Sequence, residues 1–364
     1  MIRPDISCDI FCRVVDNFGD IGVTWRLARQ LGREHGVTVR LIVDDLDSFC
    51  TIEPTIDVSR ERQEIEGVTL LAWNHSLNMR PAQLVIEAFA VNLPDSYVVA
   101  MAEMLSPPVW INLEYLSAET WIGTHHLLPS PHPTQTLVKY FFFPGFTPDT
   151  GGLIRERELL AERDAFAGTD AANPLRVFLF GYPNAAVGEL IRAISESAIS
   201  VTCTIPAGAL AASVKRIHGD ETNLSTSYSI KTIPFVPQRA FDSLLWKHDV
   251  LFVRGEDSFV RAQWAAKPFI WQIYPQSEST HWVKLNAFLA LYCDGLDDAT
   301  AAALRELWRS WNAEDHVAVG AAWGGFVRYL PELQAHALAW SKKLAQMPDL
   351  AANLLSFYQI TTKI

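Results

Sequence analysis

Residues 8–31 read CDIFCRVVDNFGDIGVTWRLARQL, and this stretch decides the fold. The apolar run at 8–15 predicts a buried strand, a short polar turn with glycines follows it, and 23–31 predicts an amphipathic helix. The turn carries Asp16 and Asp20 where a parallel sheet would deliver its strand ends, which is the ligand-binding edge of open α/β sheets. Because two carboxylates would repel a phosphate, the turn favours a cationic ligand or a role in proton transfer. The structural alternative is that Asp20 only caps the helix and Asp16 only starts a turn.

Composition limits the kind of protein this is. A chain of 364 residues is too long for one ordinary core and fits two domains. Its net charge of −11 argues against nucleic acid as a partner, since phosphate contacts need clustered Lys and Arg. The five cysteines have no regular spacing and are expected to be free thiols in a reducing compartment. We find no apolar run of membrane-spanning length and no signal peptide, so we expect a cytoplasmic protein with no membrane partner.

Strand-like and helical runs alternate along the chain, as is typical of parallel strands joined by crossover helices. After the first strand, further strands are predicted at residues 37–43, 68–72, 84–89, 109–113, 175–180, 200–205, 228–233, 250–253 and 269–273. A stretch rich in Pro, His and aromatic residues, at 125–146, is too irregular for a repeat and too apolar to be disordered. The sequence therefore predicts an α/β protein with two Rossmann-like domains facing a central cleft.

The domain boundary is expected near the middle of the chain. A charged helix is predicted at 153–166, and the sequence GTDAANP at 168–174 follows it as the best linker candidate. We therefore expect a first domain over 1–168 and a second over 174–345, with a closing helix at about 346–364 packed back on the first.

A second motif, Arg-Gly-Glu-Asp-Ser, follows a predicted strand and starts at Arg254. Gly255 lets the backbone turn closely, and a helix begins near Asp257, so its free amides and partial positive charge suit a phosphate. Arg254 adds a forked cation and Ser258 a hydroxyl donor. Glu256 and Asp257 can accept from sugar hydroxyls. In the structural alternative, Asp257 or Ser258 only caps the helix and Arg254 pairs with a carboxylate.

Four residues elsewhere in the second half can bind a nucleobase. Gln238 can read a pyrimidine edge, and Phe241 offers a face for stacking. Phe180 and Tyr182, at the end of a predicted strand, offer the same chemistry. The alternative is that these aromatic side chains belong to the core.

Three other patterns indicate no function. His125, His126 and His132 have no Cys or carboxylate at ligand spacing, so we predict no metal site. We find neither a Gly-rich dinucleotide fingerprint after the first strand nor a Gly-x-Ser-x-Gly motif.

Four stretches of the chain, at residues 8–31, 110–119, 141–152 and 254–258, resemble the bacterial protein-arginine rhamnosyltransferases that modify elongation factor P. The resemblance implies a glycosyltransferase B fold. It also implies inverting transfer of L-rhamnose from dTDP-β-L-rhamnose to one arginine of elongation factor P. The modified factor helps ribosomes that stall on consecutive prolines.

The resemblance also implies a role for each candidate residue. The family's loop aspartates fall on Asp16 and Asp20, and its catalytic glutamate falls on Glu256. Its diphosphate contacts fall on Tyr182, Arg254, Asp257 and Ser258, and its thymine contacts on Phe180, Gln238 and Phe241.

The chemistry of the acceptor suggests how these residues would act. A guanidinium has a pKa above about 12 and is a poor nucleophile, so we expect Asp20 to accept its proton and Asp16 to orient it. Arg254 and the amides near Ser258 would stabilise the leaving dTDP without a metal or other cofactor. Glu256 would fix the sugar or support the developing positive charge.

Two other functions remain open from the sequence alone. One is a glycosyltransferase of the same fold with another acceptor, such as a lipid or a small glycan. The other is a nucleotide-sugar-binding protein without catalysis, which would have no need of paired carboxylates opposite a phosphate site.

Overall fold

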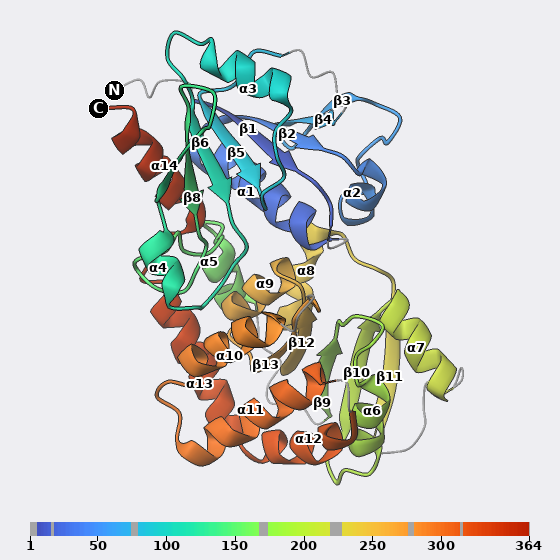
Figure 1. The fold of residues 1–364 in the computed structure, drawn as a ribbon. Helices are drawn as coiled ribbons and strands as arrows, with labels where there is room; N and C mark the ends of the chain where they lie inside the picture. The colour runs from blue at the N-terminus through green and yellow to red at the C-terminus, as the bar shows by residue number, and fades with distance from the viewer. Residues whose placement is uncertain are drawn as a thin grey trace. The chain divides into compact units, whose positions relative to one another are not determined.

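The chain folds into two compact units, Met1–Arg157 together with Met347–Ile364, and Glu158–Gln346 (Figure 1). The computed structural model describes residues 6–15, 18–73, 79–166, 174–218, 228–275, 280–313 and 316–363. Each unit contains one sheet with helices around it, which confirms the α/β class. The units divide at 157/158, before the predicted linker, whose residues 168–173 lie outside the described ranges. In those ranges we find no helix with the length and apolarity that a bilayer crossing requires.

The sheet of the first unit has the strand order β3-β4-β2-β1-β5-β6-β8-β7. Its strands are parallel except for β3 and β7, which pair antiparallel with their neighbours at the two edges. The strands are β1 (Ser7–Cys12), β2 (Thr38–Val43), β3 (Arg62–Ile65), β4 (Val68–Ala72), β5 (Leu84–Ala88), β6 (Val109–Leu113), β7 (Pro129–Pro131) and β8 (Val138–Phe142). The helices are α1 (Gly19–His35), α2 (Leu46–Ile52), α3 (Asp95–Ala102), α4 (Trp121–His125) and α14 (Leu350–Thr361).

The predicted inner strands of this sheet are confirmed, whereas its edges were not predicted. The apolar runs at 37–43, 68–72, 84–89 and 109–113 form β2, β4, β5 and β6. The stretch at 125–146, to which the sequence assigned no element, holds the hairpin of β7 and β8. Its prolines hid it, because Pro cannot donate to a ladder and is tolerated only at an edge.

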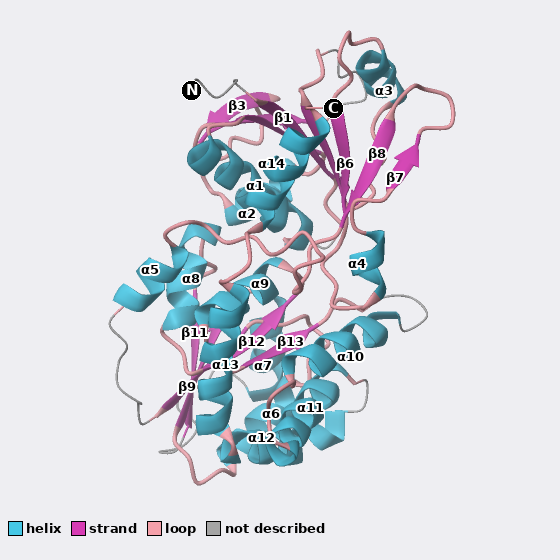
Figure 2. Ribbon diagram, turned by 90° about the vertical axis from the view of Figure 1, so that its left-hand side faces the viewer, coloured by secondary structure: helices cyan, strands magenta, loops and turns pink. Residues whose placement is uncertain are grey.

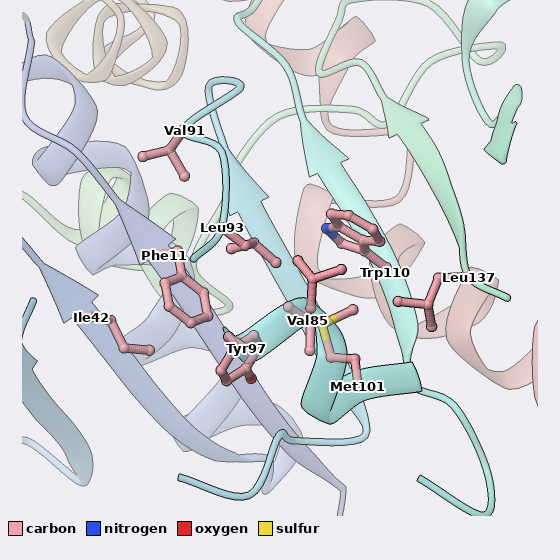
Figure 3. Close-up of a cluster of buried hydrophobic side chains, with 10 residues drawn as sticks. Phe11, Ile42, Val85, Val91, Leu93, Tyr97, Met101, Trp110 and Leu137 are labelled. Atoms are coloured by element: carbon pink, nitrogen blue, oxygen red, sulfur yellow. The ribbon is translucent and has the colours of Figure 1, made fainter. Parts of the chain in front are cut away.

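A buried cluster fixes β1, β5 and β6 against α3 (Figure 3). The Phe11 ring meets the Tyr97 ring edge to face, with 4.8 Å between centroids. Val85 from β5 and Trp110 from β6 join them, and so does Val91 from the loop after β5. The cluster therefore packs α3 against three neighbouring strands and fixes their positions relative to one another.

Two side chains of α1 contact the segments where the chain leaves the first unit, before Glu158, and re-enters it, after Gln346. Arg26 donates to both carboxylate oxygens of Glu156, at 2.7 and 2.6 Å. Gln30 donates to the Arg155 carbonyl at 2.7 Å and to Asp349 at 3.1 Å. These contacts hold the segment before Arg157 in a non-helical path, so the predicted helix at 153–166 is wrong in its first part. Only Leu159–Ala165 is helical, as α5 of the second unit.

The closing helix of the chain belongs to the first unit. Asp349 caps α14 by accepting from the Ala352 amide at 3.1 Å. The Leu350 amide donates to the Leu153 carbonyl at 2.9 Å, which joins the returning segment to the outgoing one.

The sheet of the second unit is parallel throughout, in the order β11-β10-β9-β12-β13. Figure 2 shows its strands with helices around them. Its strands are β9 (Leu175–Leu179), β10 (Val201–Pro206), β11 (Tyr228–Ile233), β12 (Val250–Arg254) and β13 (Phe269–Gln272). Besides α5, its helices are α6 (Val187–Ser195), α7 (Ala209–His218), α8 (Gln238–Trp246), α9 (Asp257–Ala265), α10 (Thr280–Tyr292), α11 (Asp298–Asn312), α12 (Val319–Arg328) and α13 (Leu330–Leu344). Every strand predicted in this half is present within a residue or two of its expected bounds.

Candidate active site

Each sheet has one place where the strand order changes direction. In the first sheet this place lies between β1 and β5, and in the second it lies between β9 and β12. The connections on either side leave for opposite faces there, so the carboxyl ends of these strands are where α/β sheets bind ligands. The predicted site residues that the structure describes lie at these two places.

Asp20 lies in the first turn of α1, with only 2% of its surface exposed. Its Oδ2 accepts a hydrogen bond from the Val15 amide at 2.8 Å and so closes the loop after β1. Phe18 occupies the N-cap position, so the alternative that Asp20 only caps α1 is wrong. The partial positive charge at a helix N-terminus stabilises this carboxylate. Asp16, the other predicted carboxylate, lies outside the described residues.

The loop that leads to Asp20 is also fixed at its start. Asp44, directly after β2, accepts from the Val14 amide at 2.9 Å and pairs with Arg13 at 3.6 Å. Burial raises the pKa of the Cys12 thiol at the end of β1, and the charges of Asp20 and Asp44 raise it further. Cys12 is therefore a neutral thiol, and the charge at this edge comes from the carboxylates.

In the second unit the Arg254 guanidinium lies over two aromatic rings. Its central carbon is 4.8 Å from the Phe180 ring centre and 4.6 Å from that of Tyr182. Phe180 and Tyr182 follow β9, and Arg254 ends β12, so the contact spans the place where the strand order changes. The rings hold the cation in place by cation–π attraction, and a guanidinium carries forked N–H donors of the kind that bind an anion.

The turn after Arg254 is held from two sides. Gly255 has a φ of 60°, a conformation that favours glycine, and its carbonyl accepts from the Trp271 indole at 2.8 Å. The Ser258 hydroxyl accepts from the Arg254 amide at 3.0 Å and donates to the Arg254 carbonyl. Glu256 is the N-cap residue of α9 and makes no side-chain cap bond, so neither Asp257 nor Ser258 caps the helix.

Asp257 holds the residue predicted to read the base. Its Oδ2 accepts from Gln238 Nε2 at 3.0 Å and from Arg261 Nε at 3.1 Å. Arg261 is 3% exposed and also donates to Asp242. A carboxylate accepts only from the amide nitrogen, so Asp257 sets the orientation of the Gln238 amide. Sequence reasoning missed Arg261 and Asp242, although Arg261 lies at the i+4 position from Asp257 on α9.

A second missed residue is Gln272, at the end of β13 and 3% exposed. Its Oε1 accepts from the Tyr182 amide at 2.7 Å, and its Nε2 donates to Asn184 at 3.2 Å. A Cβ added at Gly181 would lie 2.8 Å from Gln272 Oε1, so this contact needs a glycine there. A polar residue closing an apolar strand was the signal that could have identified it.

Phe241 completes the aromatic wall. Its ring meets the Phe180 ring at 5.5 Å between centroids, and it is 8% exposed. Gln238 and Phe241 share the first turn of α8, so all the predicted nucleotide-binding residues are connected by contacts at one sheet edge. A cation, a helix N-terminus and an aromatic wall at that edge can bind a nucleoside diphosphate.

Comparison with known proteins identifies the family to which the chain is similar. The chain matches the family model for elongation factor P rhamnosyltransferase EarP over residues 8–359. It is 46% identical to a protein-arginine rhamnosyltransferase of Pseudomonas putida, and the match covers 96% of this chain and 98% of that one. A protein-arginine rhamnosyltransferase of Pseudomonas aeruginosa is 43% identical over 97% of this chain and 98% of its own.

Solved structures agree with these matches. One that describes EarP-mediated arginine glycosylation of translation elongation factor EF-P aligns with a TM-score of 0.67 at 34% identity, over 98% of this chain and 99% of its own. The spinosyn forosaminyltransferase SpnP aligns with a TM-score of 0.52 at 12% identity over 98% of this chain and 100% of its own, which bears on the fold alone. The glycosyltransferase B fold is thereby confirmed. The chain belongs to the EarP family of elongation factor P rhamnosyltransferases, and it is a glycosyltransferase.

Proposed function

We propose that this protein transfers L-rhamnose from dTDP-β-L-rhamnose to an arginine side chain of elongation factor P, with inversion at the anomeric carbon. The single observation that carries the proposal is the Arg254 guanidinium stacked over Phe180 and Tyr182, at the turn that leads into α9. Membership of the family supplies the acceptor and the sugar.

The nucleotide would bind at the edge of the second sheet. Arg254 and the first amides of α9, near Asp257 and Ser258, would hold the diphosphate. Phe180 and Phe241 would stack on the thymine. Since Asp257 takes the amide nitrogen of Gln238, the Gln238 oxygen would accept from the imide N–H of the base.

The acceptor arginine would react at the edge of the first sheet. Its nitrogen attacks the anomeric carbon from the face opposite the leaving group, so the new C–N bond forms as the C–O bond to dTDP breaks. The bonding electrons leave with dTDP, whose growing charge Arg254 offsets without a metal or other cofactor. Asp20 takes the proton from the guanidinium, and Asp16 orients the group.

Glu256 would act on the sugar. It occupies the N-cap position of α9, beside the residues assigned to the diphosphate. There its carboxylate would fix a rhamnose hydroxyl or support positive charge on the ring carbon. The modified factor would then assist translation of consecutive prolines. We place the reaction in the cytoplasm, where free thiols such as Cys8, Cys12 and Cys203 persist.

The test is a reaction of purified protein with elongation factor P and dTDP-rhamnose, followed by intact mass spectrometry. We expect the factor to gain one deoxyhexose, and we expect no gain when its acceptor arginine is replaced by lysine. A lysine ammonium keeps the charge but not the planar fork. Absence of the deoxyhexose with the arginine form, or equal modification of the lysine form, would refute the proposal.

Binding measurements separate the competing functions. A same-fold enzyme with another acceptor would bind dTDP but leave elongation factor P unmodified. A binding protein without catalysis would bind dTDP-rhamnose and never release dTDP from it. Thermal shifts with dTDP, UDP, NAD and ATP show which nucleotide is recognised.

A further inference from the structure

The loop that follows β5 has an unusual backbone. Phe89, Ala90 and Asn92 have φ angles of 59°, 55° and 44°, in the left-handed region that glycine usually occupies. Non-glycine residues in this region are energetically costly and cluster at functional sites. The loop follows β5, where the strand order of the first sheet changes direction. It therefore belongs to the part of the sheet where α/β proteins bind ligands.

The surrounding structure compels this conformation. The Phe89 amide donates to the Leu113 carbonyl at 2.7 Å, and the Asn92 amide donates to Glu87 at 3.1 Å. Between them, Val91 is 5% exposed and packs into the cluster of Figure 3. The loop is therefore anchored at its start, middle and end.

The strained loop presents an aromatic ring to a partner ring. Phe89 stacks on Tyr115, which follows β6, with 4.5 Å between centroids and 18° between planes. Both side chains are partly exposed. In an extended backbone Phe89 would point elsewhere, so the left-handed turn is what brings the two rings together.

One buried amide connects this ring pair to a carboxylate. Asn112, on β6 and 2% exposed, accepts from the Ala90 amide at 3.2 Å through its Oδ1. Its Nδ2 donates to Glu114 Oε1 at 2.6 Å. The same residue thus fixes both the loop that carries Phe89 and the carboxylate next to Tyr115.

The strand register places these groups at the edge that carries Asp20. Phe11 of β1 pairs with Glu87 of β5, and Glu87 pairs with Asn112 of β6. The segments that leave the three strands are therefore neighbours, at roughly 5 Å per strand. One of them is the loop that Asp20 closes.

We propose that Phe89, Tyr115 and Glu114 form the subsite for the acceptor guanidinium. The planar cation stacks on the ring pair and directs its fork at the Glu114 carboxylate, while Asp20 takes the proton. This inference rests on the proposed function, and it gives a reason for arginine over lysine: an aromatic face and a carboxylate together match a flat, forked cation.

Steady-state kinetics of four variants test the subsite. We expect Glu114→Gln to raise KM for elongation factor P about 10-fold, since a hydrogen bond to a charged group is lost. Tyr115→Leu and Phe89→Leu are expected to raise it about 3-fold, and Tyr115→Phe, which keeps the ring, to raise it less than Tyr115→Leu. KM for dTDP-rhamnose and the affinity for dTDP are expected to stay within about twofold, which a general loss of structure would not allow.

The matched control is Glu64→Gln. Glu64 is an exposed carboxylate on β3, the outermost strand of the same sheet. Its removal is expected to change neither the KM for elongation factor P nor that for dTDP-rhamnose. A second probe is Nα-acetyl-arginine amide, expected to inhibit in competition with elongation factor P and to lose potency in Glu114→Gln.

The outcomes separate the subsite from the proposed function. If wild-type protein modifies elongation factor P and the Glu114 and Tyr115 variants keep its KM, the subsite is refuted and the function stands. If these variants raise KM for dTDP-rhamnose instead, the rings stack on the sugar and the subsite is likewise refuted. If wild-type protein modifies nothing, the proposed function itself fails.

Discussion

The candidate site residues lie at the carboxyl ends of the strands in both sheets. The two locations have the same topology, but their side chains carry opposite charges. At the first, the segments that follow β1, β2, β5 and β6 carry Asp20, Asp44 and Glu114 together with the stacked rings of Phe89 and Tyr115. At the second, between β9 and β12, a guanidinium rests on aromatic rings where a helix begins. Each edge combines charged and aromatic side chains, and the sign of the charge decides which ligand each can bind. A parallel sheet supplies the location, and the loop residues supply the chemistry.

Asp20→Asn breaks the acidic edge and is expected to have the largest effect. Transfer should fall about 10³-fold or more because the proton acceptor is lost, while an amide oxygen can still accept from Val15. Single-turnover assays measure the rate, and calorimetry measures dTDP binding, which should be nearly unchanged. Asp16→Asn should behave similarly but less severely. Near-normal turnover of Asp20→Asn would remove this residue from the chemistry.

Arg254→Ala breaks the basic edge, and here binding and rate should fall together. The guanidinium would meet the diphosphate in the ground state and more strongly as charge develops, so we expect a loss of about 10²–10³ in rate. The control is Arg176→Ala, which removes a cation paired with Asp249 at 2.7 Å on the same sheet, at the start of β9. Unchanged dTDP affinity in Arg254→Ala would make the turn purely structural.

Arg261→Lys sharpens the comparison by testing selectivity within the basic edge. Lysine keeps the charge beside Asp242 and Asp257 but loses the fork, so Asp257 would no longer fix the Gln238 amide. We expect the preference for dTDP over dCDP to fall about 10-fold, as one hydrogen bond to the base is lost. Gln238→Ala should lower the same ratio.

Arg176→Lys is the matched control for this measurement. It weakens another Arg–Asp pair in the same unit, that of Arg176 with Asp249. We expect a lower melting temperature with an unchanged dTDP/dCDP ratio, and an equal drop in both variants would mean that Arg261 acts only on stability.

Removal of metal ions is expected to have the smallest effect. Arg254 and the α9 amides would carry the charge of the leaving dTDP, so EDTA should leave the transfer rate within about twofold. Strict dependence on added Mg²⁺ would show that the basic edge alone does not stabilise the leaving group.

The sequence predicted the inner strands of the two sheets better than the segments around them. The run at 109–113 is apolar except for Asn112, as expected of a strand buried on both faces, so β6 was found at its observed bounds. The hairpin at 129–142 was missed because its prolines and aromatic residues follow no strand period. The helix predicted at 153–166 was too long because contacts with Arg26 and Gln30, more than a hundred residues away, override local propensity.

The candidate site divides in the same way. Arg254, Gly255 and Ser258 were visible because adjacent residues form one turn. Arg261 and Gln272 act through partners that only the fold brings near. The left-handed residues after β5 were invisible for a different reason, since neither Phe89 nor Ala90 is a residue type that favours that conformation.

The return of the chain into its first unit has a consequence for synthesis. Residues 347–364 are made after the second unit, yet Asp349 contacts Gln30, and the Leu350 amide pairs with Leu153. On the ribosome, the second unit at 158–346 can therefore fold before the first unit, whose synthesis began earlier, has all its parts. A premature stop near residue 347 would leave a finished second unit attached to an incomplete first one. The first unit is therefore complete only once residues 347–364 have been added.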